Sequence, residues 1–429
     1  MALSCENQKM KGAQDVIPWK VTDISFRPYE GYWSFNPSIH FDGETWRCVL
    51  RCCDYAMPDG RTIRSKDARP TGQQTKNAMV ILDPQSWRSI QIFKMHEKDG
   101  LSRASTPHVG YEDMRLFQTD SGGLQGIAAS LHLERGKRTF DGRPQHQPPE
   151  QVMVSFDAEY NIVKAHPIRG DGWGGTPQKN WVPFDRCVEP RFLYSIDKGS
   201  LFDDRGPIHG DAATVRPSAR AHVVAPSATA VDRSTTEVPS ALVQEEQTRA
   251  NEDRPALVKP DRKKKIRGGD VRITRGGRMK IDAGSARSPR SSSRSSARSS
   301  SRPAMARGGN DSTRMMGSGR MLLPKYAGLR GGSQLVYVSD DAWLGVGHEM
   351  SFVNGKKHYW HTFYLVDARG KMTATSEPLK LAQNGIEFAA GMAIDGDRVV
   401  ISFGVDDMDC RIGETSLAAV MELLRPIGR

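Results

Sequence analysis

The stretch GYEDMRLF, residues 110–117, places two neighbouring carboxylates, Glu112 and Asp113, just before Arg115 and an apolar Leu-Phe step. Its apolar end predicts a strand that enters a core, yet a buried charge is costly unless it is paired. Successive side chains of a regular strand point to opposite faces. We therefore expect Glu112 and Asp113 on opposite sides of the strand, with Arg115 on the side of Asp113. The question is what these charges face.

Short strands predominate around this stretch. Apolar or alternating runs recur with Gly-Asp, Asn-Gly, Asp-Gly and Pro breaks between them, which is typical of meandering antiparallel strands. One C-terminal run, SLAAVMELL at 416–424, has helical periodicity instead. Roughly 300 residues of short strands predict an all-β fold, as a pair of sandwiches, a large barrel or a propeller. The predicted strands are TWRCVLRCCDY (45–55), NAMVILD (77–83), GLQGIAASLHL (123–133), QVMVSFD (151–157), RFLYSI (191–196), SQLVYVS (333–339), HYWHTFYLVD (358–367) and DRVVISFGV (397–405).

A long basic segment interrupts this pattern. Residues 201–330 contain 26 Lys and Arg against 13 Asp and Glu, a net charge of +13, whereas the whole chain nets +11, so the remainder nets −2. No Phe, Tyr or Trp occurs between Phe202 and Tyr326. Such a composition buries too little apolar area to offset the entropy lost on ordering. We therefore predict that residues 203–325 are a disordered insert within one ordered domain.

The insert has two interpretations. Its Lys and Arg clusters suit nucleic acid or another polyanion, because they neutralise phosphates and release counterions without needing structure. Phosphorylation of the serines between the arginines would cancel this charge. Alternatively, the insert is a solvated, variable loop that happens to be basic. The sequence leaves both interpretations open.

Composition and cysteine usage indicate the class of protein. The chain has 429 residues, of which 37% are hydrophobic. No apolar run approaches the roughly 18 residues that a membrane span needs, and the N-terminal stretch has no apolar segment of the kind a secretory signal contains. The six cysteines form no C-x-x-C pair and have no His at zinc spacing. We therefore expect a protein of the reducing cytoplasm without a membrane contact, metal, disulfide framework or cofactor.

The opening stretch resembles the G-x-E-D-P-R motif of glycoside hydrolase family 130, which comprises five-bladed β-propeller glycoside phosphorylases and hydrolases. These are related to the mannosyltransferases of glycosyltransferase family 108. Met114 stands where the motif has Pro, and a long insert is not a usual feature of the family. Further pieces resemble the family in the expected order: SFNPSIHFDGETWRCVLR (34–51), QKNWVPF (178–184), WLGVGHEM (343–350), YWHTFYLVD (359–367) and IEFAAGMAIDGDRVVISFGVDD (386–407).

The resemblance implies a five-bladed β-propeller with a long disordered basic insertion and a short C-terminal helix. Residues 1–29 would be an N-terminal extension. Residues 30–202 and 326–429 would be the first and second parts of the propeller, separated by the insert at 203–325. Two distant portions of the chain would then close into one ring.

The innermost strands of such a ring line a central funnel, and the resemblance implies that Asp113 is the proton donor there. A donor of this kind needs a carboxyl whose pKa is raised in a partly dry site. Arg115 would oppose that rise, so we assign it to positioning the ligand or Asp113. The alternative is a structural salt bridge between Asp113 and Arg115 that pins two blades together.

Five further residues match positions that would contact substrate. Lys179 and His348 correspond to groups that would hold phosphate, and Arg51 is suited to an anionic donor. Asn36 and Asp407 would contact the sugar. Four of them also have a structural interpretation. Asn36 could cap a turn before a proline, Lys179 could be a solvated charge, His348 could be a hydrogen-bonded core histidine, and Asp407 could end a strand at a turn.

These assignments favour inverting transfer of a hexose, and the resemblance points to mannose. The hexose would be moved between a sugar phosphate, a sugar nucleotide or an oligosaccharide and an acceptor. A transferase or phosphorylase is favoured over a hydrolase, because several basic side chains are available for an anionic donor. These are Arg51, Arg115, Lys179 and His348. Two alternatives stay open: a glycosyltransferase that acts on modified bases in DNA held by the insert, and a carbohydrate- or nucleic-acid-binding propeller without catalysis.

Overall fold

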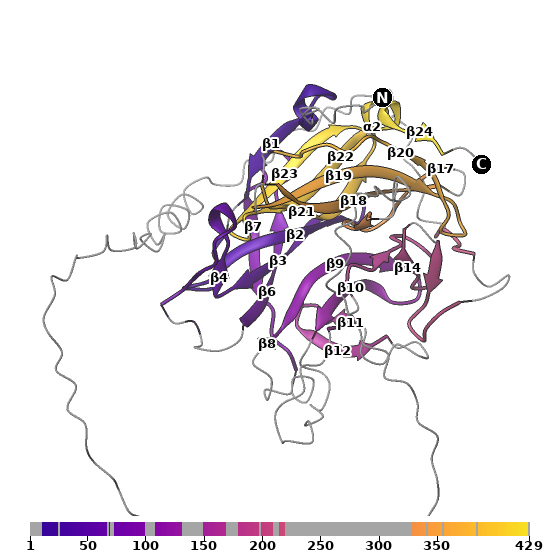
Figure 1. The fold of residues 1–429 in the computed structure, drawn as a ribbon. Helices are drawn as coiled ribbons and strands as arrows, with labels where there is room; N and C mark the ends of the chain where they lie inside the picture. The colour runs from indigo at the N-terminus through magenta and orange to yellow at the C-terminus, as the bar shows by residue number, and fades with distance from the viewer. Residues whose placement is uncertain are drawn as a thin grey trace, which may run out of the picture. The chain divides into compact units, whose positions relative to one another are not determined.

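The computed structural model describes most of the chain outside the insert (Figure 1). The described residues are 11–24, 26–66, 68, 73–98, 108–130, 149–168, 179–196, 199–208, 214–218, 328–339, 342–353, 356–382 and 385–427. All of them belong to one structural unit. Most of the predicted insert, residues 219–325, lies outside the described residues.

The described strands form a five-bladed β-propeller of mainly antiparallel sheets. Blade 1 contains β2 (Trp33–Phe41), β3 (Trp46–Cys53), β6 (Gln73–Leu82) and β7 (Ser89–Lys94), with β8 (His108–Val109) beside β6. Blade 2 contains β9 (Tyr111–Thr119), β10 (Gly123–Ser130), β11 (Glu150–Phe156) and β12 (Ile162–Pro167). Blade 3 contains β13 (Val182–Pro183), β14 (Phe192–Ser195) and β15 (Ser200–Phe202).

The last two blades follow the insert. Blade 4 contains β16 (Arg330–Gly331), β17 (Val336–Ser339), β18 (Ala342–Val353), β19 (Lys356–Val366), β20 (Met372–Thr375) and β24 (Arg425–Pro426). Blade 5 contains β21 (Glu387–Asp395), β22 (Arg398–Val405), β23 (Asp409–Ser416) and β1 (Lys20–Asp23). The smaller elements are the pair β4 (Tyr55–Ala56) and β5 (Ile63–Arg64), the 3-10 turns η1 (Ala13–Asp15) and η2 (Pro58–Gly60), and helix α2 (Leu417–Leu423).

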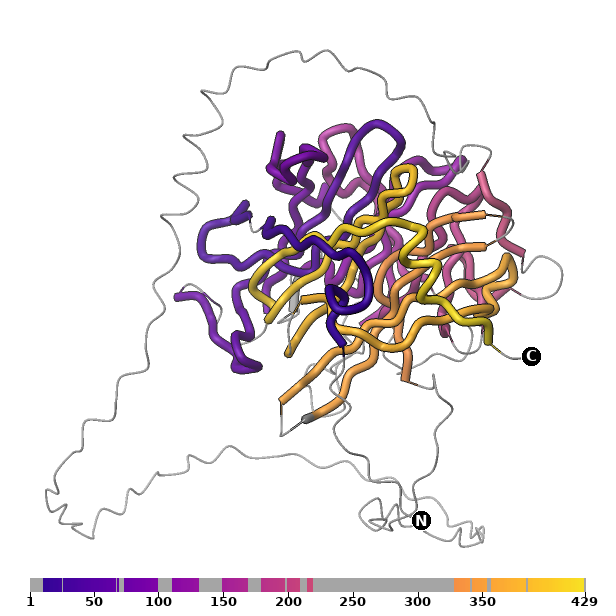
Figure 2. The backbone as a smooth tube through the Cα atoms, turned by 90° about the horizontal axis from the view of Figure 1, so that it is seen from above, coloured from indigo at the N-terminus to yellow at the C-terminus, as the bar shows by residue number. Residues whose placement is uncertain are grey.

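Both ends of the chain build blade 5, which closes the ring. β1 pairs with β23 over the register Lys20↔Glu414 to Asp23↔Arg411. Figures 1 and 2 show the indigo N-terminal segment beside the yellow C-terminal strands. Residues 20–23 therefore belong to the propeller, which begins earlier in the chain than the expected boundary at residue 30. The two distant portions of the sequence form one ring, as predicted.

Hydrophobic clusters lie between neighbouring blades all the way round the ring. Full burial of a large apolar side chain contributes roughly 1.5–3 kcal/mol, so these contacts hold one blade to the next. Representative pairs are Met79 and Leu116 for blades 1 and 2, Phe117 and Phe192 for blades 2 and 3, Leu193 and Trp343 for blades 3 and 4, Phe363 and Phe403 for blades 4 and 5, and Trp46 and Val400 for blades 1 and 5.

The sequence-based expectations for the strands and the helix are confirmed. Each predicted strand overlaps a described strand, and the predicted helix at 416–424 is α2. Ser416 caps this helix, because its Oγ accepts a hydrogen bond from the Ala419 N–H at 3.1 Å.

Ordered chain continues past residue 202, where the insert was expected to begin. Val215 is buried in the cluster between blades 3 and 4, and its N–H donates to the Ala368 carbonyl at 2.7 Å. Ser218 Oγ donates to Asp120 Oδ1 at 2.6 Å. Ile208 likewise donates its N–H to the Leu201 carbonyl at 3.0 Å, so residues 203–208 and 214–218 pack on the propeller.

Among the described residues there is neither a membrane-spanning helix nor a group of metal-binding side chains. Helix α2 has seven residues, and no helix in the described part of the chain is long and apolar enough to cross a membrane. Within the same residues, no group of three or more His, Cys, Asp or Glu side chains is arranged to hold a metal ion.

Candidate functional site

A cavity of about 320 Å³ lies where residues of all five blades converge. Six of the seven residues proposed from the sequence line it, and Arg115 is the exception. The charged and hydrogen-bonding lining residues used below are Asn36, Arg51, Glu112, Asp113, Lys179, Asn180, Arg330, His348, Lys357, Tyr359 and Asp407.

Four lining residues have a left-handed backbone. The φ angles are 47° at Asn36, 50° at Asp113, 64° at Asn180 and 48° at Asp407. Asn and Asp tolerate this region better than other residues with a Cβ, which explains their presence here. Register shifts accompany two of them, between Phe35 and Ser38 on β2 and opposite Asp113 on β10. Bulges of this kind re-aim side chains, often next to active sites.

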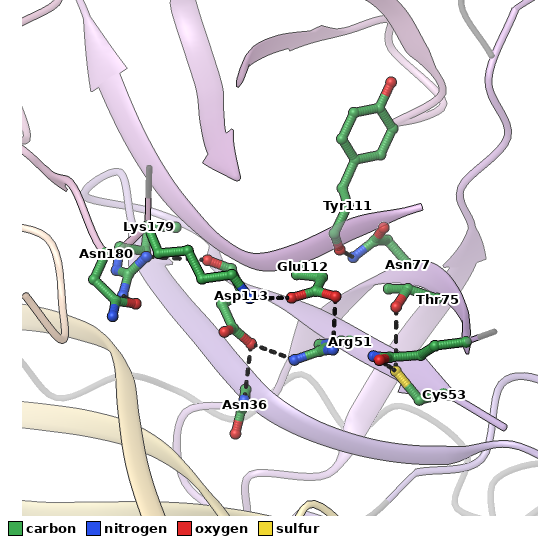
Figure 3. Close-up of polar contacts among 12 residues, drawn as sticks. Asn36, Arg51, Cys53, Thr75, Asn77, Tyr111, Glu112, Asp113, Lys179 and Asn180 are labelled. Carbon is green, nitrogen blue, oxygen red and sulfur yellow. Dashed lines mark hydrogen bonds and ion pairs between the residues drawn. The ribbon is translucent and has the colours of Figure 1, made fainter. Parts of the chain in front are cut away.

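The opening stretch shows the effect of such a bulge. Arg51 Nη1 donates to Asp113 Oδ1 at 2.8 Å, and Arg51 Nη2 lies 3.5 Å from Glu112 Oε1. Both carboxylates therefore reach the same guanidinium (Figure 3). The expectation that Glu112 and Asp113 point to opposite sides is wrong, because the left-handed φ at Asp113 breaks the two-residue alternation. Glu112, Asp113 and Arg51 thus line the cavity and form ion pairs with one another.

Asp113 is held as an anion. Burial favours its neutral form, but the Arg51 charge and the Asn36 hydrogen bond of 2.8 Å, aided by Lys179 and Arg115, outweigh it and lower the pKa to about 2. A raised pKa was expected for a proton donor at this position. That expectation is wrong for Asp113 in this cavity.

Arg115 lies behind the cavity and joins three blades. Its side chain is 1% exposed. The guanidinium donates to the Gly332 carbonyl, to the Gly331 and Asp113 carbonyls at 3.2 Å and to Asn180 Oδ1 at 3.2 Å. Burial lowers its pKa to about 10. Arg115 is not ion-paired with the Asp113 carboxylate, so the structural salt bridge considered above is absent; Arg115 fixes the backbone of Asp113 instead.

Lys179 and His348 line the cavity without offering a free charge. Lys179 Nζ forms an ion pair with Glu112 Oε2 at 2.9 Å. His348 is buried on β18, and burial together with the charges of Arg115 and Arg330 lowers its pKa to about 3. Its imidazole is therefore neutral near pH 7 and offers a hydrogen bond rather than a positive charge.

Asp407 occupies the turn between β22 and β23. Asp406 and Asp407 both have positive φ, and the Met408 N–H donates to the Val405 carbonyl at 2.9 Å, as in a type I′ turn. Burial, with the Asp113 and Asp406 charges, raises the Asp407 pKa to about 6 although Arg51 and Lys357 oppose the rise. In the described part of the chain, no hydrogen bond or ion pair engages its carboxylate.

Two cavity cations were not anticipated from the sequence. Arg330 on β16 and Lys357 on β19 line the cavity, and neither forms an ion pair within the described residues. Arg330 lies at the end of the basic segment and Lys357 in the hydrophilic hairpin sequence NGKKH, so both resembled solvated charges. Their only signal was proximity in sequence to predicted blade strands.

No protein-family model and no curated protein matches the chain, but several solved structures are similar to it. β-1,2-Mannobiose phosphorylase from Listeria innocua, in complex with β-1,2-mannobiose, has 10% identity and a TM-score of 0.44, with 94% of this chain and 99% of that chain covered. A mannose phosphorylase from Leishmania mexicana, in complex with phosphate ion, has 10% identity and a TM-score of 0.41, covering 96% and 92%.

A GDP-Man-dependent mannosyltransferase from Leishmania mexicana has 8% identity and a TM-score of 0.41, with 92% of this chain and 90% of that chain covered. The five-bladed β-propeller that the described strands form is the fold that the sequence resemblance implied.

Proposed function

We propose that the chain transfers a hexose with inversion between a phosphate-bearing donor and an acceptor hydroxyl in the propeller cavity. One observation carries this proposal: carboxylates and unpaired cations line the same cavity of about 320 Å³. That volume is at the lower end of the range for ligand pockets, which suits one sugar ring and its phosphate.

An anionic donor is favoured by the charges of the lining. Four Lys and Arg line the cavity against three Asp and Glu, a formal net charge of +1. Arg51 and Lys179 are already paired with carboxylates. Arg330 and Lys357 form no ion pair with any described residue, so a phosphate would give them charge-assisted hydrogen bonds.

The polar side chains of the lining are suited to sugar hydroxyls. Asn36 Oδ1, Arg51 Nε and His348 Nδ1 are buried polar atoms without a hydrogen-bond partner in the described part of the protein. Unsatisfied buried groups are rare in native structures and are often explained by function. A polyhydroxylated ligand offers donors and acceptors to such groups.

The reaction would be a single displacement at the anomeric carbon. An aspartate in the cavity would act as acid or base, protonating the leaving oxygen or accepting the proton of the attacking hydroxyl. The sequence resemblance assigns this role to Asp113 and points to mannose as the sugar.

A donor screen tests this function. Hexose 1-phosphates and nucleotide sugars, mannose derivatives among them, would be incubated with simple sugars as acceptors, and release of phosphate or nucleotide would be followed. We expect turnover of at least one donor by the wild type and a loss of 100-fold or more in Asp113→Asn. Equal inertness of both proteins on every donor would contradict the proposal and favour a propeller that binds without catalysis.

The basic segment favours a second candidate, in which the acceptor is a modified base in DNA. Its net charge of +13 over residues 201–330 is suited to a polyanion. Binding of a duplex oligonucleotide would be measured over a salt series, with the full chain and with residues 219–327 replaced by a Gly/Ser linker. Steeply salt-dependent binding that the linker variant loses would support this candidate, and equal binding by both would remove it.

A further inference from the structure

The two aspartates that line the cavity differ in what holds them. Asp113 Oδ1 accepts hydrogen bonds from Asn36 Nδ2 and Arg51 Nη1, each at 2.8 Å. The Asp407 carboxylate accepts none from the described residues. Its position is set by the backbone instead, because the Met57 N–H donates to the Asp406 carbonyl at 2.8 Å and the Asp406 N–H to the Ile386 carbonyl at 3.0 Å.

The groups that act on the Asp407 carboxyl come from several elements around the cavity. Arg51 and Lys357 favour its ionised form, whereas burial, Asp113 and Asp406 favour its protonated form. Two phenol rings that share this environment, Tyr55 and Tyr359, stay neutral because burial raises the pKa of each. The effects that favour protonation are the stronger, so the pKa of Asp407 is raised to about 6.

We propose that Asp407, rather than Asp113, carries the proton in glycosyl transfer, and that Asp113 remains a fixed carboxylate beside the sugar. This assignment depends on the proposed function. Two carboxylates whose environments push their pKa values apart are the usual basis for separate acid and charge-stabilising roles in one site.

The two carboxyls differ in the fraction that is protonated at pH 7. With a pKa of about 2, Asp113 would be protonated in about one molecule in 100,000 at pH 7. With a pKa of about 6, Asp407 would be protonated in about one molecule in ten. An acid or base works best when its pKa is close to the operating pH, and only Asp407 satisfies this condition.

The proposed step conserves atoms and charge. In the synthetic direction, the acceptor hydroxyl gives its proton to the Asp407 carboxylate as its oxygen bonds to the anomeric carbon. The bond from that carbon to the phosphate oxygen breaks, and the phosphate leaves with the electron pair. In the reverse direction, protonated Asp407 gives the proton back to the glycosidic oxygen while phosphate attacks. Asp113 would remain ionised and stabilise positive charge on the sugar ring.

A carboxyl titration tests the assignment without needing turnover. The full chain, labelled with carboxyl-¹³C aspartate, would be titrated from pH 3 to pH 9 and compared with Asp407→Asn. We expect one aspartate signal to titrate near pH 6 and to disappear in Asp407→Asn. In Asp113→Asn the same signal should remain and move to lower pH, because a negative charge that raises its pKa has gone. If no signal near pH 6 depends on Asp407, the assignment is wrong.

A pH–rate profile tests the role in catalysis, using the donor that the screen finds. In the synthetic direction kcat should rise with an apparent pKa near 6, and in the reverse direction it should fall with the same pKa. Asp407→Asn should lose about 100- to 10,000-fold in kcat, with both limbs absent. Asp113→Asn should keep a limb, shifted to lower pH.

Asp406→Asn is the matched control, because it changes the neighbouring carboxylate of the same turn, which does not line the cavity. It should keep most of the activity and both limbs, at slightly lower pH because the Asp406 charge also raises the pKa of Asp407. If the wild type turns over a donor and the pH-dependent limbs survive in Asp407→Asn, the assignment of Asp407 is wrong but the proposed function stands. A wild type inert on all donors would overturn the proposed function, and the catalytic role of Asp407 with it.

Discussion

The cavity has two walls that differ in how their charges are satisfied. On one wall, which we call the paired wall, Lys179, Glu112, Arg51 and Asp113 form a continuous series of ion pairs, closed by Asn36. On the other, the open wall, Arg330, Lys357 and Asp407 line the cavity without an ion pair among the described residues. The charges of the paired wall form ion pairs with one another, whereas those of the open wall form none with any described residue.

This difference separates charges that stabilise the protein from charges that are available to a ligand. A paired buried charge contributes little net stability, but removal of its partner is costly. An unpaired charge beside a cavity gains its partner only when a ligand binds, so it contributes to affinity or to proton transfer instead. Substitutions in the two walls should therefore differ in their effect on unfolding and on binding.

The largest effect is expected for Arg51→Met in the paired wall. Two largely buried carboxylates, Glu112 and Asp113, would lose their shared cation. Removal of one partner from a buried pair costs roughly 3–5 kcal/mol, and we expect the free energy of unfolding to fall by that amount in urea denaturation at pH 7. The double variant Arg51→Met with Asp113→Asn should recover part of the loss. A change below about 1 kcal/mol would mean that the paired wall is not coupled in this way.

The next effect concerns ionisation, which changes the free energy of unfolding in opposite directions at Asp113 and Asp407. The pKa of Asp113 falls from 3.8 to about 2 on folding, so its ionisation stabilises the fold above pH 4 and this stability is lost as pH falls toward 2. The pKa of Asp407 rises from 3.8 to about 6, so its ionisation costs stability that accumulates as pH rises from 4 through 6.

At pH 7 we therefore expect Asp113→Asn to lower the free energy of unfolding by about 2 kcal/mol and Asp407→Asn to raise it by about 2–3 kcal/mol. At pH 4 the gain from Asp407→Asn should nearly vanish. Denaturant titrations at both pH values measure the four differences. Destabilisation by Asp407→Asn at pH 7 would show that its carboxylate has a stabilising partner and belongs to the paired wall.

The arrangement behind this contrast could be predicted only in part from the sequence. Strand periodicity and the resemblance of the opening stretch predicted the propeller and brought Asn36, Asp113 and Asp407 to one cavity, although they are far apart in the chain. Alternation along a strand is a local rule, and it failed at Glu112 and Asp113. Nothing in the local pattern reveals a left-handed residue inside a strand, because tertiary packing selects that conformation.

The partners of the charges were harder to predict than their positions. Arg115 was assigned to positioning the ligand or Asp113, and it contacts Asp113 through the backbone carbonyl, while backbone carbonyls of blade 4 bind the same guanidinium. Because every residue has a backbone carbonyl, the sequence does not indicate which of them will accept a hydrogen bond from Arg115. Arg330 and Lys357 were missed for the opposite reason, since exposed basic residues are common and only the folded ring places these two beside the cavity.

A smaller effect, confined to binding, is expected for the open-wall cations. Arg330→Gln and Lys357→Gln should each weaken binding of inorganic phosphate about tenfold, because a hydrogen bond to a charged group contributes about 1.5 kcal/mol or more. The free energy of unfolding should change by less than about 0.5 kcal/mol, since neither side chain forms an ion pair with a described residue. Calorimetric titration with phosphate measures the affinity.

Lys356→Gln is the control for the open wall. Lys356 precedes Lys357 on β19, is exposed and does not line the cavity, and adjacent residues of a strand point to opposite faces. It should leave phosphate affinity unchanged. Equal weakening by Lys356→Gln and Lys357→Gln would indicate a diffuse electrostatic effect rather than a phosphate site.

The smallest effect is expected for Lys179→Met at the solvent end of the paired wall. Its ammonium is 45% exposed, so its pair with Glu112 is screened by water and contributes less than about 1 kcal/mol. The same charge helps to lower the pKa of Asp113, so the acid unfolding transition should shift to slightly higher pH. High salt should diminish both differences. If Lys179→Met lowered the free energy of unfolding as much as Arg51→Met does, the whole series of ion pairs would act as one buried unit. The pair between Lys179 and Glu112 would then be shielded from water in the folded protein.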